Sequence, residues 1–212
     1  ETEAPLRAKA NADGSSRAAE GIMTTDTKLK EFAVSFEAGG KECRIGGIAK
    51  GSGMIHPNLA TMLVFITTDA AVSPALLQNA LKNDVKDTFN MVSVDGDTST
   101  NDMVTVLANG MAGNAEITTE GADYDAFCAA LNLITSCLCR AIAKDGEGAS
   151  RLITCRVTGA KTTADAKICA KSVVCSSLLK AAIVGSDATW WRVLCALGYP
   201  VVDLAVYMGY VA

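Results

Sequence analysis

Histidine and aromatic residues are scarce in this sequence, and each scarcity excludes a class of function. Only 5% of the 212 residues are aromatic and the formal net charge is −4, so the stacking platforms and basic patches that bind nucleic acids are not expected. The single histidine, His56, forms no Ser-His-Asp or Cys-His arrangement, and we interpret it as a loop residue. The most apolar segment, 190–212, contains charged residues and a proline, so no membrane span is predicted there.

Metal-binding motifs are also missing. The eight cysteines include no Cys-x-x-Cys pair, and Cys137-Leu-Cys139 does not have the ligand spacing of a zinc site. We therefore predict reduced, mostly buried thiols, a reducing compartment and no metal. The acidic loop 95–102 resembles a calcium loop only in part, because Thr100 and Val106 stand where glycine and glutamate are needed. We predict a turn that caps local backbone donors there, with lining of a pocket left open.

Alternation and helical periodicity predict an α+β fold: a layered sandwich of mixed β-sheets flanked by helices. A hairpin is predicted over 31–49, with its turn at Gly39-Gly40. The other predicted strands are 62–68, central in a sheet, 89–94, 152–157 and 201–209. Helices are predicted from Ser73-Pro74 and over 121–142, 164–174 and 190–197, and a turn over 13–16.

The loop from Lys50 to Ala60 carries the most informative pattern. Its glycines lack the order of a nucleotide-binding P-loop, because Gly51 follows Lys50. They permit close backbone approach near a pocket, where the lysine would suit a carboxylate. Thr61 follows directly, and a threonine hydroxyl needs a base. Its own α-amino group can serve only if the Ala60–Thr61 bond is cut; the alternative is an ordinary strand threonine.

Five motifs resemble the ornithine acetyltransferase family, also called bifunctional glutamate N-acetyltransferases. They are "GIMTTDT", "RIGGIAKGSGMIHPNLATMLVFITTDA", "FNMVSVDGDTSTND", "DGEGASRLITCRVTGA" and "WWRVLCALGY", and the resemblance spans about 18–198. It implies autocatalytic cleavage between Ala60 and Thr61, so that residues 1–60 are the C-terminal part of an alpha chain and 61–212 the N-terminal part of a beta chain. It further implies that Thr61 is the nucleophile. Substrate contacts are implied for Thr24, Lys50, Thr61 and Glu147.

The resemblance implies transfer of an acetyl group from N-acetylornithine to glutamate through an acetyl-Thr61 intermediate, a ping-pong reaction of arginine biosynthesis. No cofactor is expected, with acetyl-CoA left open as a second acetyl donor. Two alpha and two beta chains are expected in a heterotetramer, with no nucleic-acid or membrane partner. The expected location is the cytoplasm, or a mitochondrial or plastid matrix in a eukaryote.

Departures from the family pattern leave two other functions open. Trp191 stands where the family has glycine, Cys175 where it has asparagine and Ser177 where it has proline, and the family's oxyanion donors have no counterpart here. The Trp191 side chain is expected to need space and to displace its neighbours. A non-catalytic fragment or degenerate relative acting as a structural or interaction module is the first alternative. A peptidase passing the acyl group to water is the second, and Lys50 and Glu147 disfavour it.

Overall fold

The structure is a computed structural model that describes residues 13–56 and 62–200, and the chain divides into two compact units, Glu1–Leu152 and Ile153–Ala212. The first unit contains a mixed four-stranded sheet with helices packed on it, which confirms the α+β class. The second unit is helical in its described part. Each unit has its own hydrophobic core.

The predicted hairpin is present. β1 (Lys30–Ala38) and β2 (Lys41–Lys50) pair antiparallel in register. Gly39 and Gly40 join them with φ angles of 57° and 68°. Both angles lie in the left-handed region that side chains avoid, and two such residues form the tight turn that suits the twist of a hairpin.

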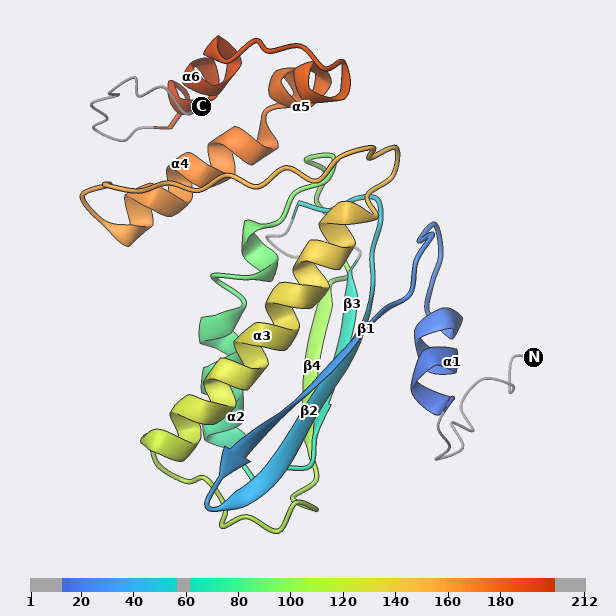
Figure 1. Cartoon of the computed structure of the whole chain (residues 1–212), viewed down its shortest axis with the longest axis vertical. Coiled ribbons are helices and arrows are strands. Elements are labelled where there is room, and N and C mark those ends of the chain that lie inside the picture. The colour runs from blue at the N-terminus through green and yellow to red at the C-terminus, as the bar shows by residue number, and fades with distance from the viewer. Residues whose placement is uncertain (1–12, 57–61, 201–212) are drawn as a thin grey trace. The chain divides into compact units, whose positions relative to one another are not determined.

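The sheet continues from β2 to β3 (Leu63–Thr68) and then to β4 (Met103–Ala108), in the order β1-β2-β3-β4 (Figure 1). β2 and β3 are antiparallel, whereas β3 and β4 are parallel. β3 therefore lies inside the sheet, as predicted, and its Val64 and Ile66 are fully buried. β4 was not predicted.

Helix α3 (Ala122–Lys144) covers one face of this sheet, with α2 (Pro74–Asp84) beside it (Figure 1). The buried residues of α3 repeat at helical spacing and face β1 and β2; they include Tyr124, Phe127, Leu131, Ile134, Leu138 and Ile142. The helix can approach β2 closely because Gly47 has no side chain. A Cβ at this position would lie only 3.1 Å from an Ile66 side-chain atom and 3.2 Å from one of Leu138. The helix α1 (Gly14–Gly21) contacts β1 and β2.

Helix α3 is also long and apolar enough to cross a membrane by length and composition alone. Core helices of globular proteins satisfy the same criterion when one face is covered. Its apolar face packs on the sheet and belongs to the main hydrophobic core. We therefore interpret α3 as the core helix of the first unit.

Several predicted elements were wrong. The segment 89–94 is a short 3-10 turn, η1 (Phe89–Met91), followed by irregular chain whose Val94 N–H donates to Ile55 O at 2.7 Å. Phe89 is buried in the core. The apolar residues of the segment can therefore pack against the core without the hydrogen-bond ladder of a strand. The predicted turn at 13–16 is the start of α1. The predicted strand 201–209 lies outside the described residues.

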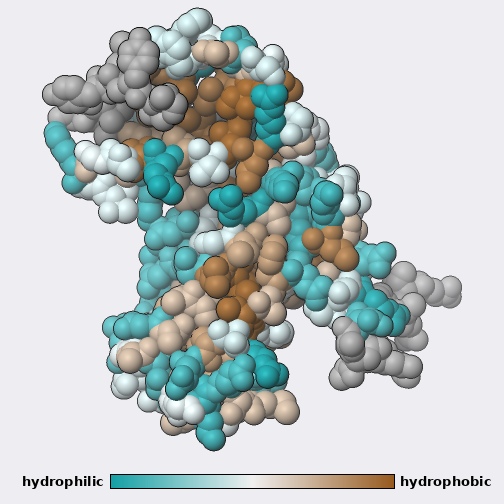
Figure 2. All heavy atoms as spheres, viewed as in Figure 1, coloured by the Kyte–Doolittle hydropathy of each residue, from teal (hydrophilic) through white to brown (hydrophobic). Residues whose placement is uncertain are grey.

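The second unit contains α4 (Thr163–Cys175), α5 (Ser177–Val184) and α6 (Trp191–Leu197). The predicted helices 164–174 and 190–197 are thereby confirmed. The predicted strand 152–157 is irregular chain, because Cys155 packs against the small helical core and the described part of this unit offers no partner strand. Apolar side chains of this unit also reach the surface (Figure 2).

Candidate functional site

Two carboxylates from distant segments meet at the ammonium group of Lys30. The Lys30 side chain is 1% exposed, and its Nζ lies 2.6 Å from Asp26 Oδ1 and 2.6 Å from Asp145 Oδ2. It also donates to the Lys28 carbonyl at 3.3 Å. Asp26 is the aspartate of the "TTDT" motif and Asp145 is the first residue of the "DGEG" motif. This buried cluster therefore holds the two motifs together.

The glycine-rich loop after β2 joins the same cluster. The Gly51 N–H donates to Asp26 Oδ1 at 2.7 Å. Ser52 Oγ donates to the Asp145 carbonyl at 2.7 Å, and the Glu147 N–H donates to the Ser52 carbonyl at 3.0 Å. The three motifs to which the predicted substrate residues belong are therefore held at one place by charge and hydrogen bonds.

The cluster is electrostatically balanced in its ionised form. Burial alone would raise the pKa of Asp145, but hydrogen bonds from the Lys30 ammonium and from the hydroxyl and N–H of Thr27 outweigh it and lower that pKa to about 2. Burial likewise opposes ionisation of Asp26, and the Gly51 N–H together with Lys30 gives a net lowering of its pKa. Both carboxylates are thus charged at neutral pH.

Lys50 is buried at the end of β2, directly before Gly51. No hydrogen bond or ion pair involves its ammonium among residues 13–56 and 62–200. Burial raises the pKa of the nearby Asp102 carboxyl, and the charge of Lys50 offsets only part of that rise. A buried charge is costly unless it is paired. The side chain is therefore suited to pairing with an anionic ligand.

Thr24 and Glu147 are exposed, in contrast to Lys50. The Thr24 N–H donates to Asp26 Oδ2 at 3.4 Å, which places Thr24 beside the Lys30 cluster. The Glu147 carboxylate lies over Gly53, where an added Cβ would be 2.5 Å from Glu147 Cδ. The absent side chain at Gly53 thus makes room for Glu147, which is the close approach that the glycine-rich loop predicted.

The two residues at the predicted cleavage site, Ala60 and Thr61, lie outside the described residues. The chain around them is held on both sides, because β2 and β3 pair antiparallel up to Lys50 and Leu63. Their roles, and the substrate contacts predicted for Thr24, Lys50 and Glu147, stay predictions.

Asp102 was not predicted as a site residue. Its Oδ1 accepts the Met62 N–H at 2.7 Å, one residue after Thr61. With Met62 and Val104 it lines a cavity of about 260 Å³, so the acidic loop does line a pocket. A carboxylate placed directly before an apolar segment was the one available signal in the sequence.

The rest of the acidic loop caps backbone, as predicted. Asp95 accepts the N–H groups of Met54 at 2.6 Å and Ile55 at 3.1 Å, which commits its carboxylate to protein donors. No cluster of three metal-ligating side chains occurs within the described ranges. His56 lies in the adjoining loop, with its Nδ1 3.1 Å from Ser93 Oγ.

All eight cysteines are free thiols, as predicted. Cys43, Cys139 and Cys169 are buried, four others are partly buried and Cys195 is exposed. Burial raises the pKa of Cys139 well above its ordinary value. Fewer of the cysteine side chains are buried than the sequence predicted.

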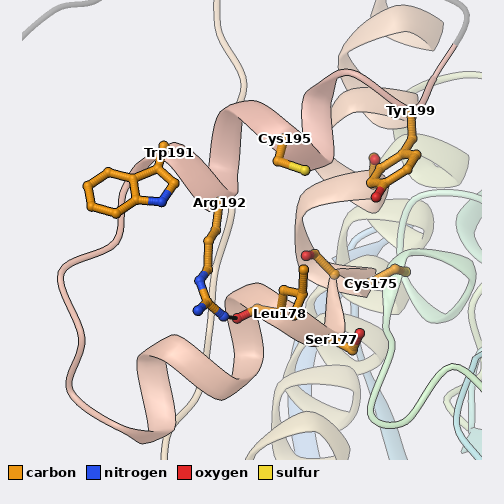
Figure 3. Close-up of a pocket in the computed structure, with 9 residues that line it drawn as sticks. Cys175, Ser177, Leu178, Trp191, Arg192, Cys195 and Tyr199 are labelled. Atoms are coloured by element: carbon orange, nitrogen blue, oxygen red, sulfur yellow. Dashed lines mark hydrogen bonds between the residues drawn. The ribbon is translucent and has the colours of Figure 1, made fainter.

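The residues that depart from the family pattern line one pocket of the second unit, with a volume of about 580 Å³. Cys175, Ser177 and Trp191 all border it (Figure 3). Arg192 closes one side by donating from Nη1 to the Leu178 carbonyl at 2.6 Å. Trp191 is 58% exposed, so the expected displacement of its neighbours is wrong: the indole extends toward solvent.

Comparisons with known proteins give a consistent picture. A family model described as the ArgJ family matches residues 2–208. The Clostridium acetobutylicum "Arginine biosynthesis bifunctional protein ArgJ 1" is 54% identical over 188 residues, which cover 89% of this chain and 46% of that protein. The Symbiobacterium thermophilum "Arginine biosynthesis bifunctional protein ArgJ" is 56% identical over 199 residues, 92% of this chain and 50% of that protein.

A solved structure is also similar. The crystal structure of the arginine biosynthesis bifunctional protein ArgJ from Bacillus halodurans superposes with a TM-score of 0.62 at 50% identity, over 64% of this chain and 63% of that chain. The chain spans about half the length of the two curated relatives quoted.

Proposed function

The chain belongs to the ArgJ family, and on that premise we propose that it forms part of an acetyltransferase of arginine biosynthesis. The enzyme moves the acetyl group of N-acetylornithine to glutamate. Acetyl-CoA serves as a second donor, in keeping with the word bifunctional in the relatives' names. These relatives are bacterial, which supports a cytoplasmic location and gives the organellar alternative no support.

One maturation step precedes the reaction: the Ala60–Thr61 peptide bond is hydrolysed, and water supplies the hydroxyl of the new Ala60 carboxyl group and a hydrogen of the new Thr61 α-amino group. The released α-amino group of Thr61, whose ordinary pKa is about 7.7–8.0, takes the proton of its own hydroxyl. Thr61 Oγ then attacks the acetyl carbonyl, ornithine leaves with a proton, and an acetyl ester remains on Thr61. The amino group of glutamate attacks that ester, forms N-acetylglutamate and restores the hydroxyl. No metal or coenzyme is needed for this exchange.

The observation that carries the proposal is Lys50, which is buried and whose ammonium has no hydrogen bond or ion pair to the residues that the structure describes. The next residue, Gly51, is bound to the Lys30 cluster through Asp26. Both substrates of the exchange have an α-carboxylate, which pairs with Lys50 and removes the cost of its burial. The exposed Glu147 carboxylate pairs with the second amine of ornithine. Thr24 contacts the substrate from the loop that Asp26 anchors.

Cleavage does not separate the two parts in this proposal. The β2–β3 ladder joins residues on either side of the cut, and so does the buried ion pair between Lys30 and Asp145. Alpha and beta chains therefore stay associated, and two copies of each form the heterotetramer.

The test is made on full-length protein carrying this chain. Denaturing mass analysis is expected to give two polypeptides, the second starting at Thr61, and the purified protein is expected to transfer acetyl from N-acetylornithine to glutamate. Thr61→Val is the matched variant, because it keeps the shape and removes the hydroxyl. A single uncut chain without transferase activity would instead identify a non-catalytic module.

A further inference from the structure

The described part of the second unit is basic, although the chain as a whole is acidic. Residues 153–200 contain six lysines and arginines and two aspartates, which give a formal charge of +4, against −4 for the whole chain. A local excess of one sign of charge attracts ligands of the opposite sign. The second unit is therefore suited to an anionic ligand.

The pocket that Cys175 and Trp191 border has no acidic residue in its lining. Its volume of about 580 Å³ falls within the range of about 300–1,000 Å³ that is usual for small-molecule sites. Its polar lining consists of Arg192, three serines and two cysteines, and its apolar lining of Leu178, Trp191 and Tyr199. The one charged side chain in this lining is therefore a cation.

The Arg192 guanidinium has donors available for a ligand. The side chain is half-buried, and its Nη1 donates to the Leu178 carbonyl at 2.6 Å. The guanidinium makes no other hydrogen bond or ion pair among residues 13–56 and 62–200. A guanidinium carries five N–H donors in a rigid fork that matches carboxylate and phosphate oxygens. The contact with Leu178 thus orients the side chain and leaves most of its donors to an anion.

Two lysines add positive charge near the pocket. Lys171 lies one helical turn before Cys175 on α4. Burial lowers the pKa of the Lys171 ammonium, Cys175 opposes this shift, and the charge of Lys180 adds to it. The two ammonium groups therefore repel each other, and a multiply charged anion nearby would relieve this repulsion. A phosphate meets this requirement better than a singly charged carboxylate.

Two aromatic rings flank the pocket. Figure 3 shows Trp191 and Tyr199 on opposite sides of it, with Arg192 between them. Both aromatic residues are more than half exposed, and an exposed ring face can stack on a planar ligand ring. We propose that this pocket binds a nucleoside phosphate, with the phosphate at Arg192 and the base on the Trp191 indole. This binding does not depend on the proposed transferase activity.

The ligand is either a free mononucleotide or the adenosine phosphate end of acetyl-CoA, the second acetyl donor of the proposed function. Both present the same ring and phosphate to the pocket, so AMP is a probe for both. If acetyl-CoA displaces bound AMP, the pocket takes the nucleotide end of the donor. If acetyl-CoA leaves AMP binding unchanged, the ligand is a free mononucleotide.

Isothermal titration calorimetry with AMP tests the proposal on full-length protein carrying this chain. Saturable binding with a Kd below about 1 mM is expected. Adenosine and inorganic phosphate, which each lack one half of the ligand, are expected to bind at least about tenfold more weakly. Arg192→Met and Trp191→Gly are each expected to weaken AMP binding at least about tenfold. The matched control is Arg156→Met, the same loss of charge at an exposed position of the same unit, with a Kd within about twofold of wild type.

Three results would overturn the inference: no saturable binding of AMP, adenosine binding as tightly as AMP, or equal AMP affinities in Arg192→Met and Arg156→Met. If the variants fail to fold, thiol alkylation of the wild type decides. Cys195 is exposed and borders the pocket, so saturating AMP is expected to slow its alkylation several-fold. Cys137 lies on α3 in the first unit and is expected to keep its rate. An unchanged rate at Cys195 would reject the site.

Discussion

Replacing Lys30 by methionine removes the positive charge that ties two motifs together, and keeps most of the side-chain volume. The side chains of Asp26 and Asp145 are 0% and 6% exposed and each lies 2.6 Å from the Lys30 ammonium. Without that ammonium, two buried carboxylates face each other with only neutral donors. Lys30→Met is therefore expected to destabilise the first unit.

The magnitude follows from the burial of the pair. Removing one partner of a buried ion pair costs about 3–5 kcal/mol. The pKa of Asp145, lowered from 3.8 to about 2, gives an independent estimate of about 2 kcal/mol at 1.36 kcal/mol per unit, shared between Lys30 and Thr27. We expect a loss of about 3 kcal/mol in the free energy of unfolding at pH 7.

The loss must also depend on pH. A lowered carboxyl pKa contributes stability that is present above the unfolded value of 3.8 and is lost as the pH falls toward 2. The difference between wild type and Lys30→Met is therefore largest near neutral pH and shrinks below pH 3.8.

Urea unfolding followed by far-UV circular dichroism measures this loss. Tryptophan fluorescence would miss it, because Trp190 and Trp191 both lie in the second unit. The control is Arg44→Met, since Arg44 forms only a 3.9 Å pair with Glu42 and both side chains are more than half exposed. It is expected to cost about 0.5 kcal/mol or less. A loss below about 1 kcal/mol in Lys30→Met, or one equal at pH 7 and pH 3, would refute the electrostatic reasoning.

Three further results are expected. In Gly53→Ala the new methyl group displaces the Glu147 carboxylate, so steady-state kinetics are expected to show a KM for N-acetylornithine about tenfold higher, with little loss of stability. The control is Gly21→Ala, where an added Cβ would meet no described atom within 4 Å, and its KM is expected to be unchanged. Gly47→Val forces α3 away from the sheet and costs about 1–3 kcal/mol in urea unfolding; a stability equal to wild type would show that α3 is not tightly packed. The cleaved chains co-elute in native gel filtration and separate only in denaturant, because the β2–β3 ladder spans the cut; separation without denaturant would contradict this.

Local patterns were enough to predict the hairpin, β3 and α3. Two consecutive glycines fix a tight turn, and the apolar residues of 121–142 repeat at a clear helical period. The segment 89–94 has equally apolar residues, but they enter the core from irregular chain. Periodicity alone cannot distinguish a strand from an apolar segment without a hydrogen-bonding neighbour.

The site was predictable only in part, since its assembly is non-local. The family motifs in the sequence pointed to Lys50 and Glu147. Nothing in the sequence indicated that Lys30 joins Asp26 to Asp145, which lies 115 positions after Lys30. Asp102 was missed for the same reason, because its partner Met62 lies 40 positions earlier. Such contacts exist only after the sheet and α3 have formed.

The covalent step itself can be observed by trapping the acylated enzyme. Cleaved full-length protein is incubated with N-acetylornithine carrying an isotopically labelled acetyl group, without glutamate, and quenched in acid. Peptide mapping is expected to find one labelled acetyl ester on the hydroxyl of Thr61, and glutamate added before the quench should discharge it. Label on a different residue, or full-rate transfer by Thr61→Val, would contradict a threonine nucleophile.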